Sequence, residues 1–219
     1  QSYGTNTSYL VWQGVWRGFF HLDPTGSVEE QTAALETEMG RLDPALLPRL
    51  PLLGAVLNLP IPDNDLTASL DAKTRKSALE GLLVECLRAR ASSQPLLIVL
   101  EDCHWLDPLS TDLIGAVGRA IADLPVLLLL VYRPRDRERQ PPLPVEGLPY
   151  FTELALSSFS AEEAERLIDL KLRQFFGEDA QVPADVVGEI TTRAAGNPFY
   201  IEEILNYLRS LDIDPRDVE

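Results

Sequence analysis

Lysine is scarce in this sequence, and acidic side chains outnumber basic ones. The chain has 219 residues, with 34 acidic residues against 19 basic ones and a formal net charge of −15. The three lysines are Lys73, Lys76 and Lys171. Domains that bind DNA or RNA usually carry a basic face, and attraction to an anionic membrane needs basic clusters. The composition therefore argues against both kinds of partner, and the acidity is more simply a solubility feature.

Cysteines and long apolar runs are also few. Cys86 and Cys103 are too few for a disulfide framework, and no cysteine or histidine spacing suits a metal site. We expect two buried or partly buried thiols in a reducing compartment, the cytoplasm. The apolar run at 124–132 is far shorter than the roughly 20 residues that a membrane span needs. No signal peptide is visible, and the first residue is Gln, so we expect a piece of a longer protein.

Helical periodicity dominates the first 91 residues. Spacings of three and four predict a helix in 1–22 with an aromatic, core-facing side: Tyr9, Trp12, Trp16, Phe19 and Phe20. A second helix is predicted from Ser27, which forms a capping box with Glu30. Prolines break 41–65 into short helices and turns. A longer amphipathic helix is predicted over 67–91.

The pattern changes near residue 95. Continuous apolar runs at 95–100 and 125–132 flank a helical segment at 108–122. Such runs are typical of strands buried on both faces, and this order predicts a parallel pair with a right-handed crossover. The alternating segment 151–156 predicts a third strand, and everything after residue 160 reads as helical.

These patterns place a domain boundary near residue 157. We expect an α/β domain over 1–157 and a small all-helical domain over 158–219. Helices are predicted at about 160–176, 183–195 and 199–210.

The most informative stretch ends the first predicted strand. Glu101 and Asp102 follow it directly, at the edge where open α/β sheets bind ligands. Adjacent carboxylates repel one another and are costly to desolvate, and a divalent cation with a polyphosphate would relieve both problems. The alternative is a strand that ends in solvated acids. Arg133 ends the next predicted strand, so a basic residue reaches the same edge.

Two further elements complete the pattern. The acids continue into Cys-His-Trp-Leu-Asp at 103–107, and Gly-Asn-Pro at 196–198 opens a helix. Together these elements resemble the ATPase module of the STAND group of the AAA+ superfamily, as found in multidomain bacterial nucleotide cyclases, serine/threonine kinases and LuxR-type activators. The resemblance covers most of the chain and is weak over 23–90. It implies an α/β fold, a three-layer parallel-sheet P-loop NTPase-like core followed by a small all-helical lid, with ATP and Mg²⁺ as ligands.

The resemblance also assigns roles at the sheet edge. The segment 96–102 matches the Walker B strand, in which Glu101 would hold Mg²⁺. Asp102 would share the metal site and orient or activate the attacking water. Arg133 matches the sensor that contacts the γ-phosphate, and its alternative is a solvated loop arginine, as for Arg135, Arg137 and Arg139.

Other matched residues carry structural alternatives. Gly196 and Pro198 match the Gly-x-Pro motif of the lid, near the adenine of the nucleotide. Independently of any ligand, Gly196 suits a left-handed helix cap and Pro198 the first residue of the next helix. Trp105 matches the Trp-x-Asp that follows Walker B, but we favour a core anchor for it. We place His104 on the surface or behind the site rather than as a catalytic base.

The chain departs from the family at the phosphate-binding loop. That loop has the form G-x-x-x-x-G-K-[ST], and this sequence has no Gly-Lys pair. Lys73-Thr74 and Lys76-Ser77 lack upstream glycines and fall in a predicted helix. The opening residues 1–4 resemble the segment just after the second strand of the family core. We therefore expect the loop and the central strand to lie upstream, and the core to be truncated at its N-terminus.

Two functions compete. The first is part of an ATP-dependent regulatory switch, in which the parent protein binds ATP or ADP, hydrolyses ATP slowly and acts on neighbouring domains or protein partners. This chain alone would have little or no ATPase activity. The second is a non-enzymatic scaffold or interaction module with a degenerate NTPase fold and a sizeable apolar surface. Any cyclase, kinase or DNA-binding function would belong to other domains, since no helix-turn-helix is visible.

Overall fold

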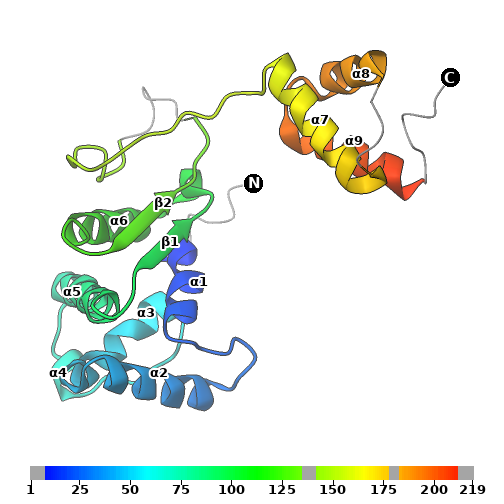
Figure 1. Ribbon diagram of the computed structural model, residues 1–219. Coiled ribbons are helices and arrows are strands. Elements are labelled where there is room, and N and C mark those ends of the chain that lie inside the picture. The colour runs from blue at the N-terminus through cyan, green and yellow to red at the C-terminus, as the bar shows by residue number, and fades with distance from the viewer. Residues whose placement is uncertain (1–7, 135–141, 178–182, 212–219) are drawn as a thin grey trace. The chain divides into compact units, whose positions relative to one another are not determined.

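The computed structural model describes residues 8–134, 142–177 and 183–211. They form a mixed helix and strand protein that is mostly helical (Figure 1). The chain divides into two compact units, Gln1–Thr152 and Glu153–Glu219. The boundary predicted from the sequence lies near residue 157. Each unit is described by itself.

Helices fill the first part of the first unit, as the periodicity predicts. They are α1(Leu10–Phe19), α2(Val28–Leu42), the 3-10 helix η1(Pro44–Leu53), α3(Gly54–Leu57), α4(Asp65–Ala68) and α5(Ala72–Ala91). The predicted capping box is confirmed, because Ser27 Oγ accepts from the Glu30 amide and Glu30 accepts from the Ser27 amide. The prolines confine η1 to 3-10 geometry, with Pro48 and Pro51 inside it.

The long helix expected over 67–91 was wrong at its start. The chain forms the short α4 first and begins α5 at Ala72. The reason is competition between two caps. Asn64 accepts from the Thr67 amide to begin α4, and Asp71 accepts from the Thr74 amide to begin α5. Asp and Asn at these positions favour a new helix start over continuation of the previous turn.

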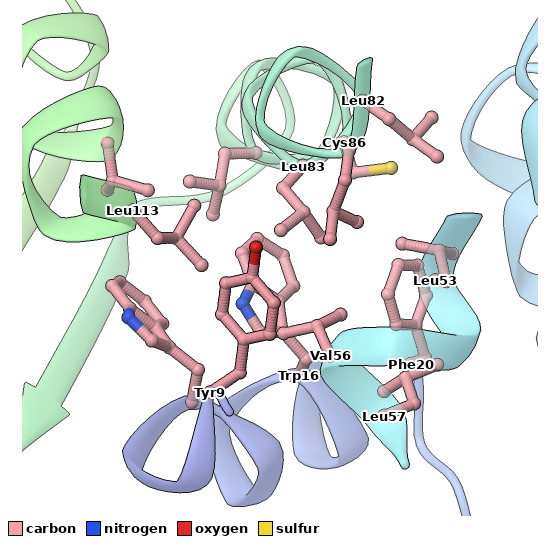
Figure 2. Packing of buried hydrophobic residues seen from close by; sticks show 14 of the residues in the cluster. Tyr9, Trp16, Phe20, Leu53, Val56, Leu57, Leu82, Leu83, Cys86 and Leu113 are labelled. Atoms are coloured by element: carbon pink, nitrogen blue, oxygen red, sulfur yellow. The ribbon is translucent and has the colours of Figure 1, made fainter. Parts of the chain in front are cut away.

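A single apolar core joins these helices (Figure 2). Trp12, Trp16 and Phe20 of the predicted aromatic face are fully buried. The amphipathic pattern predicted for this part of the chain is seen in α5, whose apolar stripe is buried as well: Leu79, Leu82, Leu83, Cys86 and Leu87. The Trp12 indole N–H donates to the Ser110 carbonyl at 3.2 Å, which ties α1 to the helix between the two strands.

The strand–helix–strand prediction is confirmed in order and direction. β1(Leu96–Leu100) and β2(Val126–Leu130) flank α6(Pro108–Ala120) and pair in parallel, from Leu96 opposite Val126 to Leu100 opposite Leu130. Figure 1 shows the two arrows side by side and pointing the same way.

Burial on both faces of these strands was predicted and is wrong. Ile98 and Leu100 face the core, but Leu97 and Leu127 are each 63% exposed. Successive side chains of a strand point to opposite faces, and the described helices cover only one of them. We call the other side the open sheet face; it consists of Leu97, Val99, Leu127, Leu129 and Val131, all exposed.

The third strand predicted at 151–156 does not form. The segment has no helix or strand, and Leu154 and Leu156 are 80% and 94% exposed. Strand backbone needs a neighbour for its N–H and C=O groups, and the sheet of the described residues contains β1 and β2 alone. The alternation predicts a strand, but no strand of the described sheet pairs with it.

The second unit is helical over most of its described residues. It contains α7(Ala161–Phe176), α8(Ala184–Ala194) and α9(Pro198–Ser210) around its own core. Ser160 and Glu163 form a capping box at the start of α7. Within the described ranges of the whole chain, every helix is too short or too polar to cross a membrane.

Candidate functional site

The carboxyl edge of the sheet brings three predicted site residues together. Beyond the strands, the Val131 amide donates to the Leu100 carbonyl and the Cys103 amide donates to the Val131 carbonyl, both at 2.9 Å. These bonds hold the segment of Glu101 and Asp102 beside the segment that leads to Arg133. All three side chains are exposed, so the edge presents two carboxylates and a guanidinium to solvent.

Asp102 turns the chain sharply after β1. Its backbone is left-handed, with φ 53° and ψ 32°, and the Trp105 amide donates back to its carbonyl at 2.9 Å. This conformation is uncommon outside glycine but is tolerated by aspartate. Such a strained residue costs on the order of 1–3 kcal/mol and persists because its surroundings fix it. The sequence offered no specific signal for this turn.

The thiol beside these acids is not a nucleophile. Cys103 is 4% exposed, and its Sγ lies 3.2 Å from the Leu100 carbonyl oxygen. Burial raises the pKa of the Cys103 thiol to about 11, and the Asp102 carboxylate acts in the same direction. Burial likewise raises the pKa of the Cys86 thiol to about 12. The prediction of two buried free thiols is confirmed, and both stay protonated near neutral pH.

Trp105 and His104 lie in opposite environments in the structure. Trp105, expected as a core anchor, is 46% exposed. Its ring lies against the His104 imidazole, with the centroids 5.1 Å apart. The His104 side chain is 11% exposed, so the surface position is wrong, whereas the other predicted place, behind the site, agrees with its position near Asp102. Both residues belong to the 3-10 turn η2(Cys103–Trp105), which points the imidazole inward and leaves the indole half exposed.

Asp107 begins α6. It is 4% exposed and accepts hydrogen bonds from the Leu109 amide, the Ser110 amide and the Ser110 hydroxyl. Pro108 takes the first helical position, where its missing N–H is no loss. The aspartate of the Trp-x-Asp motif therefore has a helix-capping role in this structure.

Gly196 and Pro198 belong to the second unit and are described within it. Gly196 has φ 72°, and a Cβ there would lie 2.5 Å from the Phe159 carbonyl oxygen. The Phe159 amide donates to the Gly196 carbonyl at 2.7 Å. Pro198 begins α9 behind Asn197, whose side chain caps the helix. Their predicted structural roles are confirmed. The loop arginines 135, 137 and 139 lie outside the described residues.

The donor groups at the edge suit one part of a magnesium–nucleotide site. Mg²⁺ is commonly held by one or two carboxylates, with phosphates and water completing its shell. Glu101 and Asp102 fit that habit. Within 8–134, 142–177 and 183–211, no group of three or more His, Cys, Asp or Glu side chains could hold a metal ion. A metal at this edge would therefore need ligands from a nucleotide. The phosphates have no glycine-rich cradle, because the sequence lacks a Gly-Lys pair.

A cavity of about 440 Å³ lies on another part of the first unit, against α2 and α5. Arg41 and Arg90 line it, and Glu38 pairs with both of them. Arg90 also stacks on the Phe19 ring, 5.0 Å from its centroid. Both guanidinium groups of this cavity share the one carboxylate of Glu38, and none of the predicted site residues lines the cavity.

Comparison with known proteins gives a relative without a named function. No protein family profile and no solved structure matches the chain. An uncharacterized protein of Rhizobium meliloti (strain 1021) is 29% identical over 192 residues. The match covers 87% of this chain and 17% of that protein. The chain is therefore similar to a small part of a much longer protein.

Proposed function

We propose that this chain is part of an ATP-binding and ATP-hydrolysing regulatory switch of the STAND type. The observation that carries the proposal is the exposed pair Glu101 and Asp102 at the carboxyl edge of a parallel strand pair, beside the segment of Arg133. Glu101 would hold Mg²⁺ and Asp102 would orient the attacking water. Arg133 would contact the γ-phosphate, and the turn of Gly196 and Pro198 would link the nucleotide to the lid.

The open sheet face supports a larger, three-layer core. Parallel sheets normally have both faces covered, whereas here apolar side chains of β1 and β2 remain exposed. The segment 151–156, which is not part of the described sheet, carries two exposed leucines that suit a strand. Polypeptide of the same parent protein, carrying the phosphate loop and a central strand, would cover the face and pair with this segment.

The switch would work through a two-state movement of the helical unit. The γ-phosphate and its Mg²⁺ bias such movements by holding contacts that are lost on hydrolysis. The output would be a neighbouring domain or a protein partner in the cytoplasm. No direct contact with nucleic acid or membrane is expected of this acidic chain.

A protein-interaction module without nucleotide is the second candidate, and the same open sheet face favours it. An exposed apolar patch commonly marks a site of protein contact. In this alternative the carboxylates of the edge are solvated and do not bind a metal.

The deciding experiment measures ATP hydrolysis and MgATP binding by the full-length parent protein. Asp102→Asn should lower the hydrolysis rate by ~100-fold or more, the usual effect of removing a general base, while MgATP binding persists. Asp123→Asn is the matched control, because Asp123 is an exposed acid in the turn before β2, at the opposite edge of the sheet. Its rate should not change.

The isolated chain gives a second readout. Calorimetric titration with MgATP should show no binding, since the chain has no phosphate cradle. Binding that Glu101→Ala weakens would mean that these residues form a nucleotide site alone, contrary to the proposal. If the parent protein binds no nucleotide, the proposed switch is excluded and the protein-interaction module is the remaining candidate.

A further inference from the structure

His104 carries two buried ring nitrogens without a hydrogen bond. Neither Nδ1 nor Nε2 has a partner among the described residues, and both atoms are shielded from water. An unsatisfied buried polar group costs about 1–3 kcal/mol. A neutral imidazole has one N–H donor and one acceptor nitrogen. The position of this ring therefore calls for at least one partner.

The carboxylate of Asp102 lies near this ring. Nε2 of His104 lies 3.9 Å from Oδ1 of Asp102, which is too long for a hydrogen bond. The other close neighbour, the Trp105 ring, makes a tilted ring contact and offers the nitrogens no acceptor. A displacement of about 1 Å would bring the carboxylate to the usual 2.7–2.9 Å of a charge-assisted bond.

Asp102 can make that movement and His104 cannot. The Asp102 side chain is 76% exposed, whereas its backbone is fixed by the turn that returns the Trp105 amide to its carbonyl. The imidazole is enclosed. Rotation of the Asp102 side chain therefore closes the gap without any change in the core.

We propose that His104 is a positioning residue for Asp102, donating from Nε2 to Oδ1. The bond would restrict the rotation of an otherwise free carboxylate and direct its second oxygen away from the protein. This is the relation in which a histidine and a carboxylate orient one another around many reactive centres. What Asp102 then acts on rests on the proposed function, but the His104–Asp102 pair does not.

The pair can be tested in this chain by NMR of ¹⁵N-labelled histidine. The sequence has two histidines, and His21 is exposed, so it is an internal control. We expect His104 as the Nε2–H tautomer with a slowly exchanging ring proton. Asp102→Asn should shift the ring signals of His104 and leave those of His21 unchanged. A His104 ring protonated at Nδ1 would overturn the pair. So would His104 ring signals that do not change in Asp102→Asn.

The positioning role is tested in the full-length parent protein by replacing His104 with each of the two amide side chains, glutamine and asparagine. The His104→Gln amide reaches the place of Nε2, while the His104→Asn amide reaches only that of Nδ1. We expect His104→Asn to lower kcat by ~10–100-fold, as for other supporting partners of reactive groups, with KM for ATP unchanged. His104→Gln should retain kcat within about threefold, and near-UV circular dichroism of both variants checks the fold.

The outcomes separate the two proposals. A parent protein without ATPase activity, combined with the expected NMR result, would refute the proposed function and keep the pair. ATPase activity with equal kcat in both variants would refute the positioning role and keep the function.

Discussion

The aromatic core beneath α1 and the open sheet face are built from the same class of side chain and end in opposite environments. Trp12, Trp16 and Phe20 are fully buried, whereas Leu97 and Leu127 are 63% exposed. Apolar burial stabilises by roughly 25 cal/mol per Å² removed from water, so the core contributes heavily and the open face contributes little until something covers it. An apolar residue in the sequence thus indicates that burial would be favourable, but whether it is buried depends on the polypeptide around it.

The largest expected difference is between a tryptophan of the aromatic core and the half-exposed tryptophan that follows β1. Trp16→Ala in the core should lower the free energy of unfolding by about 3–5 kcal/mol. Trp105→Ala at the sheet edge should lower it by less than ~1 kcal/mol, since the ring is half exposed. Urea denaturation followed by circular dichroism measures both. Equal losses would mean that the edge is as closely packed as the core.

The next largest difference is between the two buried thiols at alkaline pH, Cys86 in α5 and Cys103 just after β1. In the folded protein burial raises the pKa of Cys86 from 9.0 to about 12 and that of Cys103 to about 11. The unfolded chain therefore releases these protons first, and stability falls as pH rises. Each contribution is complete below pH 9 and is lost as pH rises through the folded value.

The slope of this loss identifies the thiol. It approaches ~1.4 kcal/mol per pH unit for each group. Cys86→Ala should flatten the decline up to about pH 12, and Cys103→Ala only up to about pH 11. The free energy of unfolding measured from pH 8 to 11.5 provides the check, because the slope is independent of the cavity that each substitution leaves. An unchanged slope in Cys86→Ala would contradict the assignment.

The smallest effect is expected on the open sheet face. Leu97→Ala should change the free energy of unfolding by no more than ~0.5 kcal/mol. Ile98→Ala, the adjacent residue of the same strand on the buried face, should cost about 2–4 kcal/mol. Urea denaturation at two protein concentrations tests the pair. Similar costs for both would show that the open face is covered in solution by another copy of the chain.

Local signals in the sequence were sufficient for most of the helices. Ser27 with Glu30 predicts the start of α2, and the apolar spacing of α1 and α5 predicts their buried faces. These features depend on residues three or four positions apart. The start of α5 was missed because Asp71 competes with a helical pattern that is continuous through it.

Features that depend on distant polypeptide could not be predicted in this way. The runs of β1 and β2 predict cover on two faces, and segment 151–156 predicts a strand, but neither says which residues supply the partner. At the candidate site, Glu101 and Asp102 were found because their place after a strand is visible in the sequence. The inward turn of His104 and the left-handed backbone of Asp102 arise from the turn itself, which has no distinctive pattern.

The contact between Gly196 and Phe159 closes the helical unit on itself. The residue before the α7 capping box is held against the turn that precedes α9, because the Phe159 amide donates to the Gly196 carbonyl. The close approach leaves no room for a Cβ at position 196. Any other residue there would push the entry of the chain away from the turn, so this one glycine fixes where the polypeptide enters the three-helix unit.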